Sequence, residues 1–374
     1  MRMPPPHAHR RPWRLLEVVG LAGALASAGC GGTPAAVYSI DTTPLALTSA
    51  HGAGVRDLRG AYRWAFCRRL PSPGPTCDDV LLRLGGEPAP PADGARPGLP
   101  GRYRIAFVPG FLAECLDGIA RPFSDVMESL SRNGFDVHHL PVAGRGTSAG
   151  NADQLARELG KLPADTRPVI VVAYSKGLPD LLEMVVRHPA AAESIAAIVS
   201  VAGAVNGSLL ADRLHPALRA GLSSLPLTRC RQGTGSELVD LQRDTRVAWW
   251  DRHGAEVTAP VFALVAAPRS EHVSPVLWET HRQLAQIEPR NDGLLLWYDQ
   301  VIPGGSLLGY VDADHLAVAV PFARALSGLM PLFPDTVPRT ALIEAAIEVV
   351  DRVLGDRGAA TRERRTTRSA VVPR

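Results

Sequence analysis

The chain has 374 residues, of which 46% are hydrophobic and 21% are charged, and its formal net charge is +3. Residues 1–29 alone carry that net charge, so the remainder is close to neutral, which argues against nucleic acid as a partner. The length suits one large α/β domain with insertions. The sequence contains neither an internal repeat nor a metal-ligand cluster.

The first 29 residues have the features of an export signal peptide. Three arginines precede an apolar run, "VVGLAGALASAG", which is too short to span a bilayer and ends in small residues. The stretch "ASAGC" resembles a bacterial lipoprotein cleavage site, which implies that Cys30 is lipidated and becomes the first mature residue. A soluble exported protein cut near Ala28 is the alternative. Because Gly31 is not aspartate, the resemblance implies an outer-membrane location, on the periplasmic or the surface face.

Four further cysteines remain in the mature chain. An even number of cysteines in an exported protein favours disulfides. Cys67 and Cys77 flank a turn-rich segment, "RRLPSPGPT", that brings its ends together, so we expect them to pair and to leave Cys115 with Cys230. Reduced, buried thiols are the alternative.

The predicted elements begin after a small-residue tether. Residues 30–100 comprise this tether and an N-terminal extension without strong periodicity, and they end in a Pro/Gly/Ala linker. Strand signals then follow at residues 103–108, 135–142, 169–173, 195–203, 259–267 and 306–311. Helix signals lie between them at residues 119–134, 151–162, 178–187 and 274–290, the second of these capped by Asn151.

This alternation predicts an α/β domain over residues 101–356, with a mainly parallel central sheet, flanking helices and right-handed crossovers. Partly amphipathic helical stretches at about 207–254 predict a helical cap region. The last stretch, residues 357–374, is basic and is expected to be a disordered tail.

One predicted strand runs directly into a helix with only a serine at the bend. Residues 169–173 form a continuous apolar run, and helical spacing begins at Leu178. Such a tight turn strains the corner residue, exposes its side chain and requires small neighbours two positions away, here Ala173 and Gly177. Ser175 would lie at a helix N-terminus, where backbone N–H groups stabilise negative charge. The pattern predicts a nucleophile elbow.

With this elbow the chain resembles the α/β-hydrolase superfamily, and more closely its bacterial lipases and esterases, over roughly residues 102–330. "FVPGFLAEC" ends a strand in Pro-Gly-Phe where lipases usually have His-Gly-x, and "VAGAVNGSLLAD" occupies the place of the lipase stretch that leads into the cap. The resemblance implies that the backbone N–H groups of Phe111 and Lys176 form an oxyanion hole. Both donors belong to the main chain, so Pro109 in place of histidine does not remove them.

The resemblance also implies a catalytic triad. "RNDGLL" matches the Asn-Asp-Gly of lipase-like hydrolases, which makes Asp292 the acid, although the same tripeptide is a favoured turn. His315 follows the last predicted strand and precedes a helix. The order Ser175, Asp292, His315 is that of the family.

Other carboxylates are less well placed to orient the histidine. Asp312 and Asp314 flank His315 too closely to turn back to its ring. Asp251 precedes the strand at 259–267, and Asp299 is expected to cap an element or face solvent.

The implied reaction is acyl transfer from a carboxylic ester, with lipids or polyesters as the favoured substrates, and without a cofactor or metal. Calcium is not expected, because "HLAVAVPF" has no carboxylate just after His315. A thioesterase or amidase could use the same triad, and a non-catalytic lipoprotein that binds a lipid or a partner is the alternative from another class. Lys176 is interpreted either as an exposed lysine or as a contact to an acidic group of the substrate. The expected partners are the ester and the membrane that holds the lipid anchor.

Overall fold

The computed structural model describes residues 54–84, 86–90, 100–115, 121–163, 165–224, 230–322 and 337–370, with side chains of the last helix described to residue 356. The predicted signal peptide, Cys30 and the tether lie outside these residues.

The described strands form one sheet with the order β1-β8-β7-β6-β5-β3-β4, and β2 pairs with β8 off this path. Every pairing is parallel except that of β2 with β8. The mainly parallel sheet predicted from the sequence is therefore confirmed. The strand bounds are β1 (Arg56–Asp57), β2 (Leu81–Leu82), β3 (Arg104–Val108), β4 (Asp136–His139), β5 (Val169–Tyr174), β6 (Ile195–Val201), β7 (Val261–Ala266) and β8 (Ser306–Val311).

Helices and short 3-10 turns connect these strands. The α-helices are α2 (Arg59–Cys67), α3 (Cys77–Val80), α4 (Ser124–Arg132), α5 (Ser148–Gly160), α6 (Gly177–Arg187), α7 (Pro189–Ala192), α8 (Leu209–Arg213), α9 (Pro216–Ser224), α10 (Ser236–Val239), α11 (Arg243–His253), α12 (Trp278–Ala285) and α14 (Arg339–Ala370). The 3-10 turns are η1 (Gly254–Glu256), η2 (Ser270–His272), η3 (Pro275–Leu277) and η4 (Trp297–Gln300).

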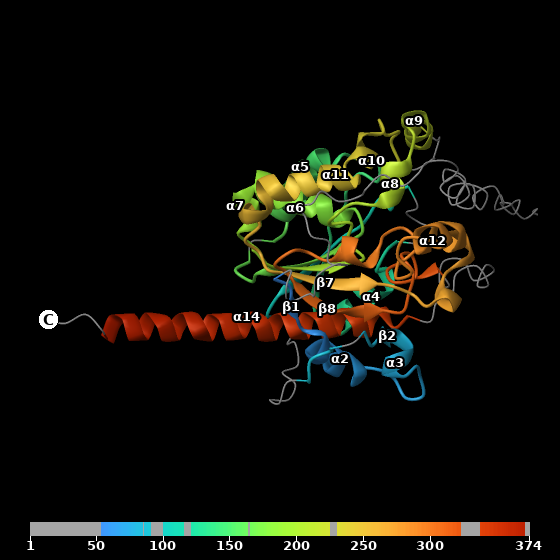
Figure 1. Ribbon diagram of the computed structural model, residues 1–374. Coiled ribbons are helices and arrows are strands. Elements are labelled where there is room, and N and C mark those ends of the chain that lie inside the picture. The colour runs from blue at the N-terminus through green and yellow to red at the C-terminus, as the bar shows by residue number, and fades with distance from the viewer. Residues whose placement is uncertain are drawn as a thin grey trace, which may run out of the picture.

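The helices cover the sheet in two layers. The chain leaves β3 towards β4 and then returns across β3 to β5, so successive right-handed crossovers place α4 and α5 on opposite faces. Helices α5, α6 and α11 cover one face, while α2, α4 and α14 lie on the other (Figure 1). At β3 and β5 the direction of the connections reverses, and such a switch point opens a crevice at the carboxyl ends of the strands.

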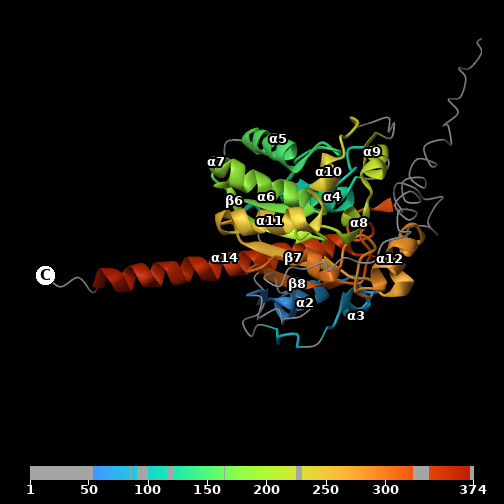
Figure 2. The same ribbon diagram turned by 45° about the horizontal axis from the view of Figure 1, so that its top comes forward.

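The far end of α14 projects beyond the sheet and the helices that cover it (Figure 2). The sequence predicted a disordered tail from residue 357, whereas the helix continues to Ala370. Arginine and alanine are frequent in this stretch and favour helix, which offsets the repulsion among its like charges.

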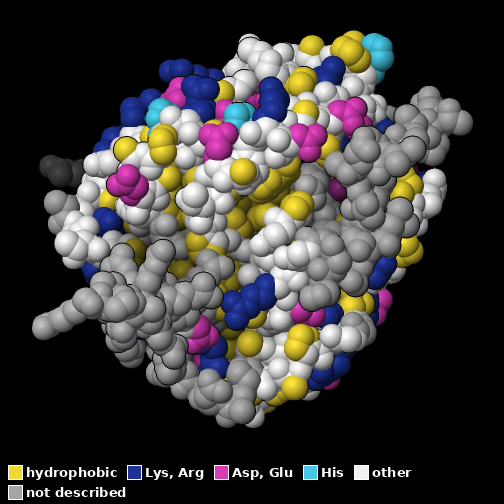
Figure 3. Space-filling view, turned by 60° about the vertical axis from the view of Figure 1, so that its left-hand side comes forward, with side chains coloured by type: hydrophobic (Ala, Val, Ile, Leu, Met, Phe, Trp, Pro, Cys, Tyr) yellow, Lys and Arg dark blue, Asp and Glu magenta, His cyan; other side chains and the backbone are white. Residues whose placement is uncertain are grey.

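The surface seen from the side has charged side chains of both signs spread over it, with hydrophobic side chains gathered in a hollow near its centre (Figure 3). No large region of this face has a single sign of charge. Within the described residues, no helix is long and apolar enough to cross a lipid bilayer.

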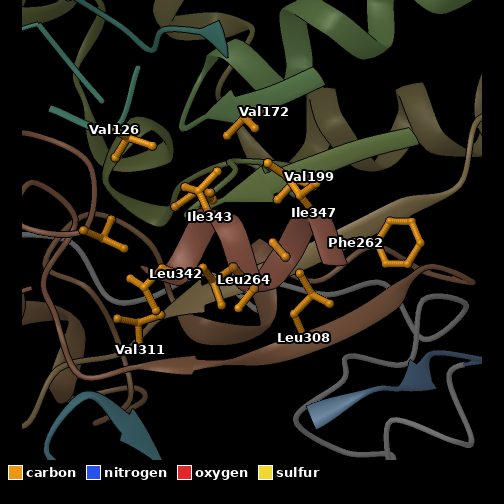
Figure 4. Close-up of a cluster of buried hydrophobic side chains, with 14 of the residues drawn as sticks. Val126, Val172, Val199, Phe262, Leu264, Leu308, Val311, Leu342, Ile343 and Ile347 are labelled. Carbon is orange, nitrogen blue, oxygen red and sulfur yellow. The ribbon is translucent and has the colours of Figure 1, made fainter. Parts of the chain in front are cut away.

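The first part of α14 is a buried element of the core. Leu342, Ile343 and Ile347 are at most 1% exposed and pack against the sheet, with Val199 and Leu264 among their neighbours (Figure 4). The opposite face of the sheet has its own apolar cluster beneath α5, α6 and α11. Both faces of the central strands are thus buried, which explains their uninterrupted apolar sequences.

The N-terminal extension belongs to the same domain as the central sheet, contrary to the boundary predicted at residue 100. Strands β1 and β2 both pair with β8, and α2 packs on α14. Each of these strands has only two residues, too few for an alternating pattern to identify it.

The start of α5 also differs from the prediction. Thr147 is the N-cap, and its hydroxyl accepts a hydrogen bond of 3.1 Å from the Gly150 amide. Asn151, the predicted cap, lies inside the helix and is buried. The predicted cap region does contain the short helices α8 to α11.

Candidate active site

Ser175 occupies the bend between β5 and α6. Its backbone φ is +52°, a left-handed conformation that non-glycine residues rarely adopt. A β-carbon on Gly177 would lie 2.4 Å from the Pro109 carbonyl oxygen, so this position cannot accept a side chain without moving the neighbouring strand end. The local geometry is that of the strained strand–turn–helix expected from the sequence.

The structure brings Ser175, His315 and Asp292 together from three segments that follow β5, β8 and β7. The Ser175 Oγ lies 2.9 Å from His315 Nε2, and His315 Nδ1 lies 2.7 Å from Asp292 Oδ2. The other oxygen of Asp292 accepts hydrogen bonds from the amides of Leu294 and Leu295, at 2.9 and 2.6 Å. His315 is 3% exposed and Asp292 is fully buried, so water cannot compete for this contact.

Tyr174 contacts both the backbone and the ring of His315. Its hydroxyl donates a hydrogen bond of 2.7 Å to the His315 carbonyl, and its ring centroid lies 5.2 Å from that of the imidazole. Burial raises the pKa of Tyr174 well above its ordinary value, so the phenol remains a donor. Sequence reasoning assigned no role to Tyr174. Its position directly before Ser175 was the one sequence feature that could have indicated a role at the site.

The other carboxylates considered from the sequence have different partners. Asp314 accepts hydrogen bonds from the amides of Ser274, Leu316 and Ala317, at 2.6 to 2.9 Å. Asp312 pairs with Arg269. These contacts direct both side chains away from the imidazole.

Asp299, expected to cap an element or face solvent, is instead 1% exposed. Its carboxylate pairs with the buried guanidinium of Arg243 at 2.7 Å. Burial raises the pKa of Asp299 to about 7, despite the opposing effect of Arg243. The partner is 56 residues away, which is why sequence position did not reveal the pair.

The loop after β3 lies against the nucleophile. A β-carbon on Gly110 would approach the Ser175 β-carbon to 2.8 Å. Leu112, directly after Phe111, has a φ of +62°, and its amide donates a hydrogen bond of 2.8 Å to the Gly144 carbonyl. Phe111 is thus held between two fixed positions beside Ser175.

A disulfide joins this loop to the cap. Cys115 and Cys230 are bonded, and so are Cys67 and Cys77, as predicted. The side chain of Phe111 also packs against an apolar cluster from the cap, which consists of Leu214, Leu218, Leu222 and Leu238. The cap therefore contacts the Phe111 loop through a covalent link and an apolar surface.

Neither role predicted for the side chain of Lys176, an exposed lysine or a contact to the substrate, agrees with its position. The side chain is 1% exposed, and its ammonium lies 2.6 Å from Asp180 Oδ1. Residues four apart share one side of a helix, so the lysine turns along α6 into the protein, away from solvent and substrate.

Within the described part of the chain, no group of three or more His, Cys, Asp or Glu side chains is arranged to hold a metal ion. The arrangement of Ser175, His315 and Asp292 requires none, because an imidazole can activate a serine without a metal.

A parallel sheet with a strained serine elbow at its switch point defines an α/β-hydrolase. The metagenomic carboxyl esterase MGS0156, whose crystal structure is known, matches the chain with a TM-score of 0.77 and 33% sequence identity. The match covers 91% of this chain and 99% of the esterase. The chain belongs to the same family of carboxyl esterases, and it is a carboxylic ester hydrolase.

Other solved structures are less similar. The mature lipase BlEst2 of Bacillus licheniformis is 20% identical, with a TM-score of 0.48 over 64% of this chain and 92% of the lipase. EstA from Clostridium botulinum is 12% identical, with a TM-score of 0.48 over 72% of this chain and 92% of EstA. No protein-family profile and no curated protein sequence matches the chain.

Proposed function

We propose that this esterase cleaves carboxylic esters through an acyl-enzyme formed on Ser175. The observation that supports this most strongly is the continuous hydrogen-bonded series from Ser175 Oγ through His315 to Asp292. The strained backbone of Ser175 fits the same assignment, because backbone strain of this kind clusters at active sites.

In this mechanism Ser175 Oγ attacks the ester carbonyl while His315 Nε2 takes the hydroxyl proton. Asp292 accepts a hydrogen bond from the Nδ1–H group of His315, which orients the imidazole and stabilises the imidazolium. His315 then returns the proton to the departing alcohol. Water, deprotonated by the same imidazole, attacks the acyl-enzyme and releases the carboxylic acid.

The negative charge on the carbonyl oxygen would be stabilised by the amides of Phe111 and Lys176. Within the described residues, neither amide donates to a backbone carbonyl, so both remain available to a ligand. Lys176 is also the N-cap of α6, whose N-terminus favours negative charge.

The cap leucines favour an apolar substrate group. Leu214, Leu222 and Leu238 are each less than 10% exposed and lie beside Phe111. An ester with a hydrocarbon chain would extend this apolar surface, whereas a charged group would lose hydration there without a partner. We therefore favour lipid-like esters over small charged ones.

The same proposal includes attachment to the outer membrane through a lipidated Cys30. It is supported by the arginines, apolar run and small residues that precede this cysteine in the sequence. A lipid anchor would hold the esterase close to lipid substrates.

A fluorophosphonate probe tests the proposed nucleophile. The wild-type protein should become labelled, and Ser175→Ala should not. The control is Ser200→Ala, which removes another buried serine hydroxyl, from β6, and should leave labelling intact. Labelling of Ser175→Ala would assign the nucleophile elsewhere.

Matched substrates distinguish the alternatives. The test substrates are the carboxylic ester, the thioester and the amide of one butyryl compound. We expect the protein to cleave the ester faster than the other two, or to cleave the ester alone. A preference for the thioester or the amide would reassign the reaction, and lack of cleavage together with lack of labelling would favour a non-catalytic binding protein.

A further inference from the structure

The buried pair formed by Lys176 and Asp180 extends into a longer hydrogen-bonded series. Asp180 uses both carboxylate oxygens: Oδ1 accepts from Lys176 Nζ at 2.6 Å and from Ser148 Oγ at 2.7 Å, and Oδ2 accepts from Asn151 Nδ2 at 2.7 Å. Asp180, Lys176 and Asn151 are all 1% exposed. The positive charge of Lys176 balances the negative charge of Asp180, because a buried carboxylate needs a partner of opposite charge.

Asn151 continues the series to a second loop. Its side-chain oxygen accepts a hydrogen bond from the Ala143 amide, and its side-chain nitrogen donates to the Ala143 carbonyl, both at 3.1 Å. A side-chain amide that contacts both main-chain groups of one residue fixes that residue in position and orientation.

The next residue completes the connection to the oxyanion loop. The Gly144 carbonyl accepts the hydrogen bond from the Leu112 amide at 2.8 Å, and the Gly144 amide donates to Glu114 Oε2 at 2.9 Å. Leu112 directly follows Phe111. One series of hydrogen bonds therefore runs from the side chain of Lys176 to the residue next to Phe111.

We propose that Lys176, Asp180 and Asn151 are positioning residues that set the separation of the two oxyanion donors, the amides of Phe111 and Lys176. This inference rests on the proposed function, since it assumes that these two amides bind the oxyanion. The loops that hold them belong to different strands, β3 and β5, and neither loop sequence alone fixes the distance between them. Small displacements of such donors reduce catalysis strongly.

The test compares Lys176→Met and Asn151→Ala with the wild-type protein on a 4-nitrophenyl ester. Both variants should lower kcat by about 10- to 100-fold, less than the loss of an entire donor, while KM changes by less than about threefold. A trifluoromethyl ketone, which forms a hemiketal oxyanion with the serine, should bind more weakly by the same factor as kcat/KM falls.

Arg63→Met is the matched control. Arg63 is also a buried cation, paired with Glu87 at 2.6 Å, but it lies on α2, over the opposite face of the sheet from α5 and α6. Its replacement should lower stability without changing kcat or the affinity for the ketone. Asn151→Ala keeps the inference testable if Lys176→Met does not fold, because it leaves the ion pair intact.

The double variant tests whether the two residues act through one series. If they do, Lys176→Met with Asn151→Ala should lower kcat by less than the product of the single effects. Unchanged kcat and ketone affinity in folded single variants would overturn the inference, as would a raised KM with unchanged kcat. A wild-type protein that neither reacts with a fluorophosphonate nor cleaves esters would instead reject the proposed function, and this inference with it.

Discussion

Asp292 differs from the neighbouring carboxylates in what its two oxygens contact. One oxygen is held by two backbone amides of its own turn, which leaves the other directed at His315 Nδ1. The His315 amide also donates to the Asp292 carbonyl at 2.9 Å, so backbone and side chain join the same two residues. Few rotations of either side chain are compatible with these contacts.

Replacing Asp292 by asparagine should lower kcat by about 10³- to 10⁴-fold. An amide nitrogen facing Nδ1 would favour the wrong tautomer of His315 and would no longer stabilise its charged form. Ester hydrolysis by folded Asp292→Asn and Asp314→Asn provides the measurement. Near-normal turnover in the first variant together with loss in the second would assign the acid to Asp314.

Asp299 makes stability depend on pH in the direction opposite to most carboxylates. Its pKa is about 7 in the folded protein, above its ordinary value of 3.8, so the unfolded chain loses the proton first as pH rises. Its stabilising contribution is complete below the ordinary pKa and is lost as pH rises to the folded pKa.

The free energy of unfolding of the wild-type protein, measured relative to Asp299→Asn, should therefore fall between pH 4 and pH 7, by about 4 kcal/mol at most. Denaturant titrations at several pH values provide this difference. A difference that stays constant, or that rises with pH, would show that Arg243 keeps the carboxylate ionised throughout.

Residues whose roles depend on local sequence were the easiest to predict. Ser175 was recognised because its turn requires small residues at fixed offsets. Lys176 and Asp299 were misjudged because their partners lie within the folded interior, where burial and pairing are decided by packing rather than by neighbours in the sequence.

Among the elements, the central strands β5 and β7 were predicted within a few residues, because both of their faces are buried and their sequences are continuously apolar. The ends of the helices were less predictable. Asn151 was the predicted cap of α5, but Thr147 caps this helix and tertiary contacts engage Asn151 instead.

The Cys115–Cys230 disulfide should contribute more to stability than Cys67–Cys77. It closes a loop of 115 residues, compared with 10, which corresponds to about 5 and about 3 kcal/mol on the chain-entropy estimate. Denaturant unfolding of the two paired Cys→Ala variants provides the comparison. Equal losses would indicate that native-state contacts, rather than loop length, determine the contribution.

Removing Cys115 and Cys230 should also lower kcat, because this disulfide joins the Phe111 loop to the cap. Removing Cys67 and Cys77 should leave kcat unchanged at temperatures where the protein stays folded, since this disulfide lies in the N-terminal extension. Equal kcat in both variants would show that the disulfide between the Phe111 loop and the cap does not affect catalysis.

At the scale of the whole molecule, the two ends of the described chain stabilise each other. Helix α2 packs on α14, and the Tyr62 hydroxyl donates to the Leu342 carbonyl at 3.0 Å across 280 residues. Such distant contacts have no local signature, so the extension was predicted to lie outside the domain.

If Cys30 is the lipid attachment site, Cys30→Ser should release the esterase from the membrane fraction without loss of catalytic activity on a soluble ester. Fractionation of cells that express the full-length chain, with Cys67→Ala/Cys77→Ala as a control for general effects of cysteine removal, measures this. Retention of Cys30→Ser in membranes would rule out the lipid anchor.

The Cys115–Cys230 bond also has a consequence for the cell that synthesises the esterase. Disulfides form in oxidising compartments and are rare in the reducing cytosol. If the signal peptide directs export as we propose, a newly made chain would lack the link between the Phe111 loop and the cap until it leaves the cytosol. If the esterase is exported as proposed, its activity on the producer's own intracellular esters would then be lower before export than after it, without a separate inhibitor.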